Sequence, residues 1–152
     1  MTREHLTFQS TSGMQVTAYI YRPASSSVAS RSGVVYLHGG SARGKETAPE
    51  IKNPMALDGW TVLSLDLLHY GERGTDVLTT YSNEDKAERL YNEPATYLAF
   101  VEQTAKDASR GYDFLVRELG IDPDQIILVG HSRGGVLSSI VGAVETRFAG
   151  WC

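Results

Sequence analysis

The sequence has little of three things that would each point to a particular class of protein. It has one cysteine, Cys152, in 152 residues, which excludes an internal disulfide and a zinc site built from several thiolates. Its formal net charge is −4, with acids and bases interspersed, so no basic surface for nucleic acid or an anionic membrane is expected. No apolar run reaches signal-peptide or transmembrane length. These absences favour a cytoplasmic protein with a small-molecule ligand and no nucleic-acid or membrane partner.

What the sequence does contain suits one globular domain over residues 1–152. Hydrophobic residues make up 41% of the chain, and a chain of this length buries roughly 68 to 70% of its unfolded surface. No internal repeat divides it.

The stretch from Ile126 to Val144 organises the rest of the chain. Four apolar residues before Gly130 predict a buried strand, and apolar residues at helical spacing after Gly135 predict a helix. The helix residues are Val136, Leu137, Ile140, Val141 and Val144. Ser132 stands at the turn between strand and helix, flanked by Gly130 and Gly134. Such a turn requires strained dihedrals, and glycines allow strand and helix to converge.

Patterns elsewhere predict an α/β fold with a mostly parallel sheet covered by helices. Residues 5–10 and 14–21 alternate around Ser12-Gly13 and predict a β-hairpin. Residues 33–38 are a continuous apolar run, typical of a strand covered on both faces, and residues 60–66 are predicted as a second buried strand. A helix is expected from a cap at Asn53, with Pro54 in its first position, to Gly59. A longer one follows Pro94, with an apolar stripe at steps of three and four from Leu98 to Leu119.

Three motifs together resemble the N-terminal part of the α/β-hydrolase superfamily. They are Leu37-His-Gly-Gly40, Asp66 followed by Tyr70-Gly-Glu-Arg73, and Gly130-His-Ser-Arg-Gly134. In subfamily they are similar to dienelactone-hydrolase and acyl-peptidase-like serine esterases. The resemblance covers essentially the whole chain.

The resemblance implies a serine hydrolase that acts on carboxylic esters or related acyl compounds and needs no cofactor or metal. Ser132 would be the nucleophile of an acyl-enzyme. The backbone amide of Arg133 and one from Gly40 or Ser41 would form the oxyanion hole. His38 would stabilise the loop beside these amides, and Asp66 the loop that follows it.

The triad that the family uses is not complete in this sequence. In the family an acid and then a histidine follow the serine, yet the residues after Ser132 contain no Asp, no His and, as their only acid, Glu145. We therefore expect a chain that lacks the C-terminal part of its fold, with a strand opening near its end. Its exposed sheet edge would invite self-association.

The histidines offer no obvious replacement for the missing base. His131 neighbours the serine but projects from a sharp turn, which favours a place in the pocket wall. His69 follows the strand ending at Asp66 and either faces the cleft or is exposed on a loop. His38 is the third possible pocket residue, and His5 starts the first strand.

Two other functions remain open at this point. Gly39 to Lys45 matches the Gly-x-x-x-x-Gly-Lys pattern of a phosphate-binding loop and follows a buried strand. Glu46 stands where a hydroxyl should meet magnesium, however, and Pro49 interrupts the helix that should follow. The other alternative is a hydrolase-like chain without catalysis that binds a ligand or oligomerises.

Overall fold

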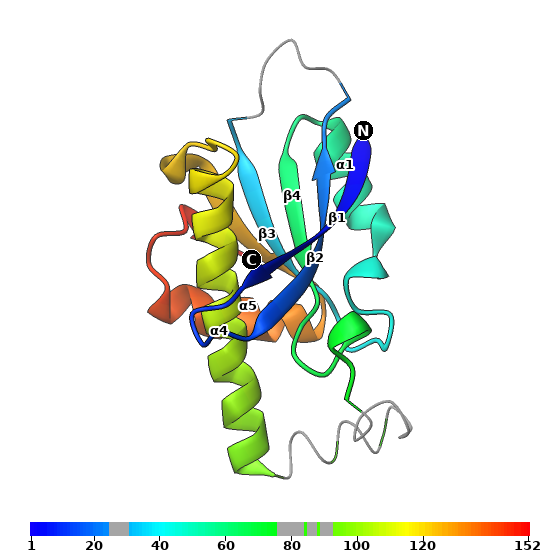
Figure 1. The fold of residues 1–152 in the computed structure, drawn as a ribbon, viewed down its shortest axis with the longest axis vertical. Coiled ribbons are helices and arrows are strands. Elements are labelled where there is room, and N and C mark those ends of the chain that lie inside the picture. The colour runs from blue at the N-terminus through cyan, green and yellow to red at the C-terminus, as the bar shows by residue number, and fades with distance from the viewer. Residues whose placement is uncertain (25–30, 76–83, 85–87, 89–92) are drawn as a thin grey trace.

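The computed structural model describes residues 1–24, 31–75, 84, 88 and 93–152. The exposed loop expected between Ala24 and Ser32 and the polar stretch expected between Thr75 and Glu93 fall mainly outside these residues. The described part is an α/β fold in which helices flank one sheet (Figure 1). The expected fold class is therefore confirmed.

Six strands form the sheet in the order β1-β2-β4-β3-β5-β6. Their bounds are Thr2–Gln9 for β1, Gln15–Arg22 for β2, Gly33–Leu37 for β3, Thr61–Leu65 for β4, Ile126–Gly130 for β5 and Gly150–Trp151 for β6. The β1-β2 hairpin and the β2-β4 pair are antiparallel, and the other three pairs are parallel. The three segments that the sequence predicts as buried strands are thus the parallel strands β3, β4 and β5.

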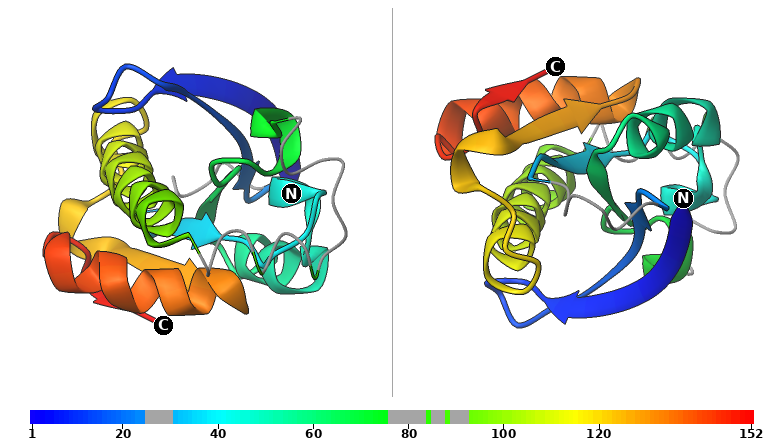
Figure 2. Two further views of the ribbon diagram at one scale, coloured as in Figure 1. Left: turned by 90° about the horizontal axis from the view of Figure 1, so that it is seen from below. Right: turned by 90° about the horizontal axis from the view of Figure 1, so that it is seen from above.

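Helices cover both faces of this sheet. Helix α4 (Pro94–Arg117) and helix α5 (Arg133–Val144) share the larger core cluster with the side chains of one face, among them Leu63 and Leu128. Helix α1 (Pro49–Leu57) contributes to a second cluster on the other face, with Tyr36 and Val62. Figure 2 shows α1 and α4 on opposite sides of the strands. This layering places the carboxyl ends of β3, β4 and β5 at one rim of the sheet.

The start of α1 differs from the expectation. The helix begins at Pro49, after Ala48, so Asn53 is not its cap and Pro54 lies inside it. Proline suits the first position of a helix because its missing N–H has no acceptor there. Pro49 meets that requirement five residues earlier than Pro54 does. The predicted start is wrong because a proline such as Pro49 suggests the interruption of a helix, whereas here it occupies the first position of one.

The apolar stripe expected in α4 is buried or partly buried from Val101 to Leu119 but not at its first residue, and the stripe expected in α5 is largely exposed. Leu98 is 66% exposed, because the first turns of α4 extend past the strands (Figure 1). In α5, Val136, Ile140 and Val144 are exposed, whereas Leu137 and Val141 are buried. Spacing identified both helices, but the sheet decides which residues of an apolar helix are buried.

The short strand β6 lies beside β5. Ile127 and Leu128 pair with Gly150 and Trp151 in parallel register. The strand expected to open near Cys152 is therefore present, and β6 is the last strand on this side of the described sheet.

Candidate active site

The backbone at Ser132 adopts an unusual conformation. Ser132 lies between β5 and α5 with φ 54° and ψ −114°. Positive φ at a residue with a side chain costs about 1 to 3 kcal/mol and persists only where the surrounding structure enforces it. Its side chain is exposed at the rim of the sheet. The strained turn expected from the sequence is confirmed, and it presents a hydroxyl to solvent.

Gly130 and Gly134 enforce this turn by close backbone contacts. A Cβ at Gly130 would lie 2.1 Å from the carbonyl oxygen of Gly134, and a Cβ at Gly134 would lie 2.0 Å from the carbonyl oxygen of Leu37. No side chain can occupy either space. Strand β5, helix α5 and the end of β3 can therefore meet only because both positions are glycine.

A pocket of about 450 Å³ opens at the serine. It is lined by Gly40, Ser132, Arg133 and Val136. The N–H of Ser41 donates to the carbonyl of Gly39 at 2.8 Å, whereas the N–H of Gly40 donates to no acceptor in the described part of the chain. Of the two amides that the sequence left open, Gly40 is the one available to a ligand.

Arg133 begins helix α5, where backbone N–H groups have no acceptor within the helix. The N-terminus of a helix also carries a partial positive charge. Both properties suit an amide that receives a developing negative charge. Arg133 and Gly40 both line the pocket that Ser132 lines.

His38 lies below the pocket and not in its wall. It is fully buried; its Nδ1 donates to the Gly39 carbonyl at 2.6 Å, and its Nε2 accepts from the Leu67 amide at 3.0 Å. These bonds assign the proton to Nδ1. Burial lowers the pKa of His38 to about 4. The ring therefore stays neutral and ties the loops after β3 and β4 together, as the resemblance implies, and it has no nitrogen left for catalysis.

The other histidines do not contact the serine hydroxyl by hydrogen bonds. His69 has φ 70° and pairs through Nδ1 with the Thr75 hydroxyl at 3.2 Å. Burial lowers its pKa. His131 is exposed beside Gly39, and His5 pairs with Glu72 at 3.0 Å. Within the described residues, Ser132 Oγ has no hydrogen-bond partner.

Asp66 is the centre of a buried polar network and not part of the pocket. Its carboxylate accepts from the Thr17 hydroxyl at 2.7 Å, from the Lys45 amide at 2.7 Å and from Lys45 Nζ at 2.6 Å. The Glu72 amide also donates to it, at 3.2 Å. Asp66 thus fixes the loops on either side of it, as expected.

This network also decides against a phosphate-binding loop at Gly39 to Lys45. The Lys45 side chain is 2% exposed and ion-paired with Asp66 and Glu72, so it does not reach toward a ligand. Only a 3-10 turn, Gly44–Glu46, follows directly, and α1 begins later, at Pro49. The helix N-terminus that would bind phosphate is absent from this position.

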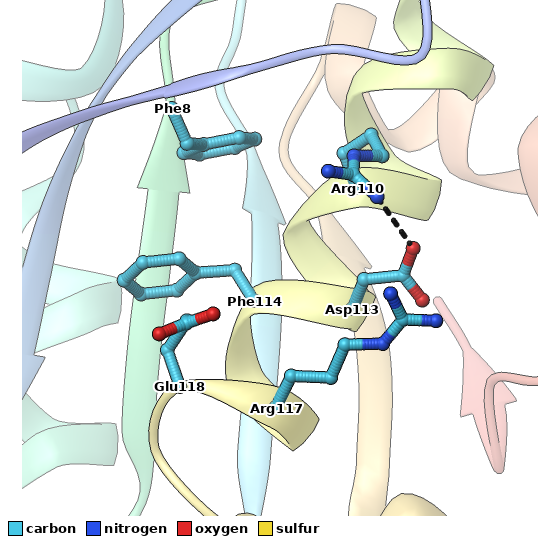
Figure 3. Close-up of a pocket in the computed structure, with 6 residues that line it drawn as sticks. All are labelled: Phe8, Arg110, Asp113, Phe114, Arg117 and Glu118. Atoms are coloured by element: carbon cyan, nitrogen blue, oxygen red, sulfur yellow. Dashed lines mark hydrogen bonds and ion pairs between the residues drawn. The ribbon is translucent and has the colours of Figure 1, made fainter.

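A second pocket, of about 300 Å³, lies between β1 and α4 (Figure 3). The rings of Phe8 and Phe114 stack there with centroids 5.7 Å apart, and Arg110 donates to Asp113 at 3.2 Å. No residue that the sequence singled out lies in it. Across the described residues, no cluster of histidine, cysteine and acidic side chains could hold a metal ion, and no helix is long and apolar enough to cross a membrane.

Sequence reasoning missed the side chain of Arg133. It used this residue only for its amide, yet the guanidinium lies against Gly40 and its Cζ is 5.4 Å from the centre of the Tyr70 ring. The signal was present, because a long cationic side chain directly after the serine must lie near the pocket.

Known proteins are similar to this chain in sequence and in fold. A model of the alpha/beta hydrolase family matches residues 34–150. The multifunctional-autoprocessing repeats-in-toxin proteins of Vibrio cholerae serotype O1 and Vibrio vulnificus are 29% identical over 142 and 131 residues, covering 90% and 82% of this chain. The chain spans only 3% and 2% of those two proteins.

Solved structures share the fold at low sequence identity. Alpha/beta hydrolase GrgF from Penicillium sp. sh18 matches with a TM-score of 0.74 at 16% identity, over 99% of this chain and 45% of its own. A putative dienelactone hydrolase from Klebsiella pneumoniae matches with 0.74 at 15%, over 98% and 60%. A carboxyl esterase from Bacillus coagulans matches with 0.68 at 18%, over 99% and 43%. This chain thus spans about half the length of these structures.

Proposed function

Because the chain belongs to the alpha/beta hydrolase family, we propose that it hydrolyses carboxylic esters or related acyl compounds through an acyl-enzyme on Ser132. The observation that carries the proposal is the strained backbone at Ser132, which presents the residue in a pocket that Gly40 and Arg133 also line. Strain of this kind is kept at sites where geometry matters for chemistry. Solved esterases that share the fold support the same class of reaction.

In the proposed reaction, Ser132 Oγ attacks the carbonyl carbon of the ester and loses its proton to a base. The carbonyl oxygen becomes an oxyanion and accepts hydrogen bonds from the amides of Gly40 and Arg133. Collapse of this tetrahedral species breaks the bond to the alkoxy oxygen, which takes the proton held by the base and leaves as the alcohol, and the acyl group stays on Ser132. Water then releases the acid and restores the serine.

The described residues offer no base next to the Ser132 hydroxyl. No described histidine is hydrogen-bonded to Ser132, and His38 has both nitrogens engaged. An enzyme without its triad partners keeps only about 10³- to 10⁴-fold acceleration from the oxyanion hole and binding. We therefore expect weak activity from these residues alone, and full activity would require a histidine and an acid that they do not supply.

Ester hydrolysis with a serine control tests the proposal. We expect slow release of p-nitrophenol from p-nitrophenyl acetate that disappears in Ser132→Ala. The matched control is Ser139→Ala, because Ser139 is exposed on α5 and its hydroxyl donates only to the Gly135 carbonyl. Equal rates for wild type and Ser132→Ala would refute the role of Ser132.

A second function is favoured by one observation. The exposed side chains of Val136, Ile140 and Val144 leave an apolar face on α5, which suits a chain that associates without catalysis. A protein that associates but shows no hydrolysis dependent on Ser132 would support this alternative.

A further inference from the structure

Among the described residues that line the pocket at Ser132, one side chain is charged, and it is positive. This residue is Arg133; Gly40, Ser132 and Val136 are not ionisable. The N-terminal end of α5 adds its partial positive charge at the same place. The field in this pocket therefore favours an anion over a neutral or cationic group.

The guanidinium is held next to the amide proposed to bind the oxyanion. The three atoms nearest to a Cβ built on Gly40 are Cζ, Nη1 and Nη2 of Arg133, at 3.0, 3.1 and 3.2 Å. The plane of the guanidinium thus lies against the Gly40 backbone. The ring of Tyr70, itself 2% exposed, lies on the cation at 5.4 Å and restricts its position.

Charge persists at this position at neutral pH. Burial lowers the pKa of Arg133, but an arginine remains protonated in proteins. Because the side chain is partly buried, its interaction with an anion is screened less than that of an exposed arginine. Guanidinium groups also bind carboxylates through two parallel hydrogen bonds.

From this placement we propose that Arg133 selects anionic esters, in which a carboxylate lies a few bonds from the carbonyl attacked by Ser132. The inference rests on the proposed function for the identity of the reacting carbonyl. The carbonyl would lie at the Gly40 and Arg133 amides, and the carboxylate would pair with the guanidinium beside them. Arg133 then contributes twice, with its amide to the reacting oxygen and with its side chain to the choice of substrate.

Binding to a protein that cannot turn over the ligand tests this directly. In a Ser132→Ala background, dissociation constants are measured by NMR titration for monomethyl succinate and for methyl 4-oxopentanoate, a neutral ester of similar shape. A hydrogen-bonded charge pair contributes about 1.5 kcal/mol or more, so the anionic ester should bind at least about tenfold more tightly. Equal affinities would overturn the proposal.

Adding Arg133→Gln should bring the ratio of the two affinities close to one. The matched control is Arg43→Gln, which removes the same charge from an exposed residue outside the pocket and should preserve the ratio. A ratio that survives Arg133→Gln, or that falls equally with Arg43→Gln, contradicts a specific role for Arg133.

A salt titration keeps the proposal testable if Arg133→Gln does not fold. In the Ser132→Ala protein, raising sodium chloride from about 50 mM to about 500 mM should reduce the preference for the anionic ester, because mobile ions screen the pair. A preference unchanged by salt would contradict the proposal. Since binding is measured without a nucleophile, a correct ratio combined with absent hydrolysis would refute the proposed function and leave the anion preference standing.

Discussion

Replacing Gly134 with alanine should disrupt the turn that presents Ser132. The new Cβ would lie 2.0 Å from the carbonyl oxygen of Leu37, 2.6 Å from its carbonyl carbon and 2.8 Å from the carbonyl oxygen of His38. All three are backbone atoms of β3 and the loop after it, so no side-chain rotation relieves the clash. Helix α5 would have to move away from the sheet by about 1.5 Å to restore an ordinary contact.

The size of the expected loss in stability of Gly134→Ala follows from two opposing effects. Alanine gains up to about 1 kcal/mol over glycine in a helix. Forcing an extra methyl group into a packed backbone contact costs typically 1 to 3 kcal/mol and occasionally more. With three backbone atoms inside contact distance, we expect the upper part of that range to prevail. The net loss in free energy of unfolding should be about 2 kcal/mol, a large share of the 5 to 15 kcal/mol typical of a domain.

Gly135→Ala is the matched control for this prediction. It is the next residue of α5, and the nearest atom to a Cβ there would be the Gly130 carbonyl oxygen, at 3.5 Å. That is ordinary van der Waals contact, so the helical preference of alanine should leave this variant as stable as wild type or slightly more stable. Urea unfolding followed by circular dichroism measures both variants. A Gly134→Ala protein as stable as Gly135→Ala would refute the steric account of the turn.

Three further predictions concern the site's supports and the surface beside it. Asp66→Asn should cost about 3 kcal/mol in unfolding free energy, the lower end of the range for breaking a buried ion pair, because it leaves the buried ammonium of Lys45 with only the half-exposed Glu72 as a carboxylate partner; the exposed Asp58→Asn should cost little. Burial lowers the pKa of His38 to about 4 in the folded protein, from 6.5 for an ordinary histidine. As pH falls, the unfolded chain therefore binds a proton at His38 before the folded protein does. Stability should therefore be lost from about pH 6.5 down to pH 4, and less of it in His38→Asn. Finally, light scattering should detect self-association that weakens in Val144→Lys, because Val144 is 68% exposed on the apolar face of α5; a monodisperse monomer at all concentrations would contradict this.

The sequence predicted the parts of the fold that depend on local pattern. Largely apolar runs identified β3 and β4, and alternation around Ser12-Gly13 identified the first hairpin. The glycines around Ser132 predicted the strained turn, because the need for missing side chains is visible in the sequence itself.

What could not be predicted depends on packing between distant segments. Whether Val136 or Leu137 is buried depends on where the sheet lies, since both belong to an apolar helix. The burial of Lys45 could be predicted only by knowing that its side chain pairs with Asp66, which is twenty-one residues away in sequence. The choice between the amides of Gly40 and Ser41 depended on one local hydrogen bond, from Ser41 to Gly39.

The central claim is that Ser132 is presented as a nucleophile, and covalent labelling tests it most directly. A fluorophosphonate probe phosphonylates a serine faster than bulk hydroxyls when an oxyanion site receives the phosphoryl oxygen, and much faster still when a base also activates the hydroxyl. Peptide mapping by mass spectrometry should place a slow modification on Ser132, absent in Ser132→Ala and retained in Ser139→Ala. Labelling elsewhere, or no labelling of a folded protein after prolonged incubation, would contradict the account.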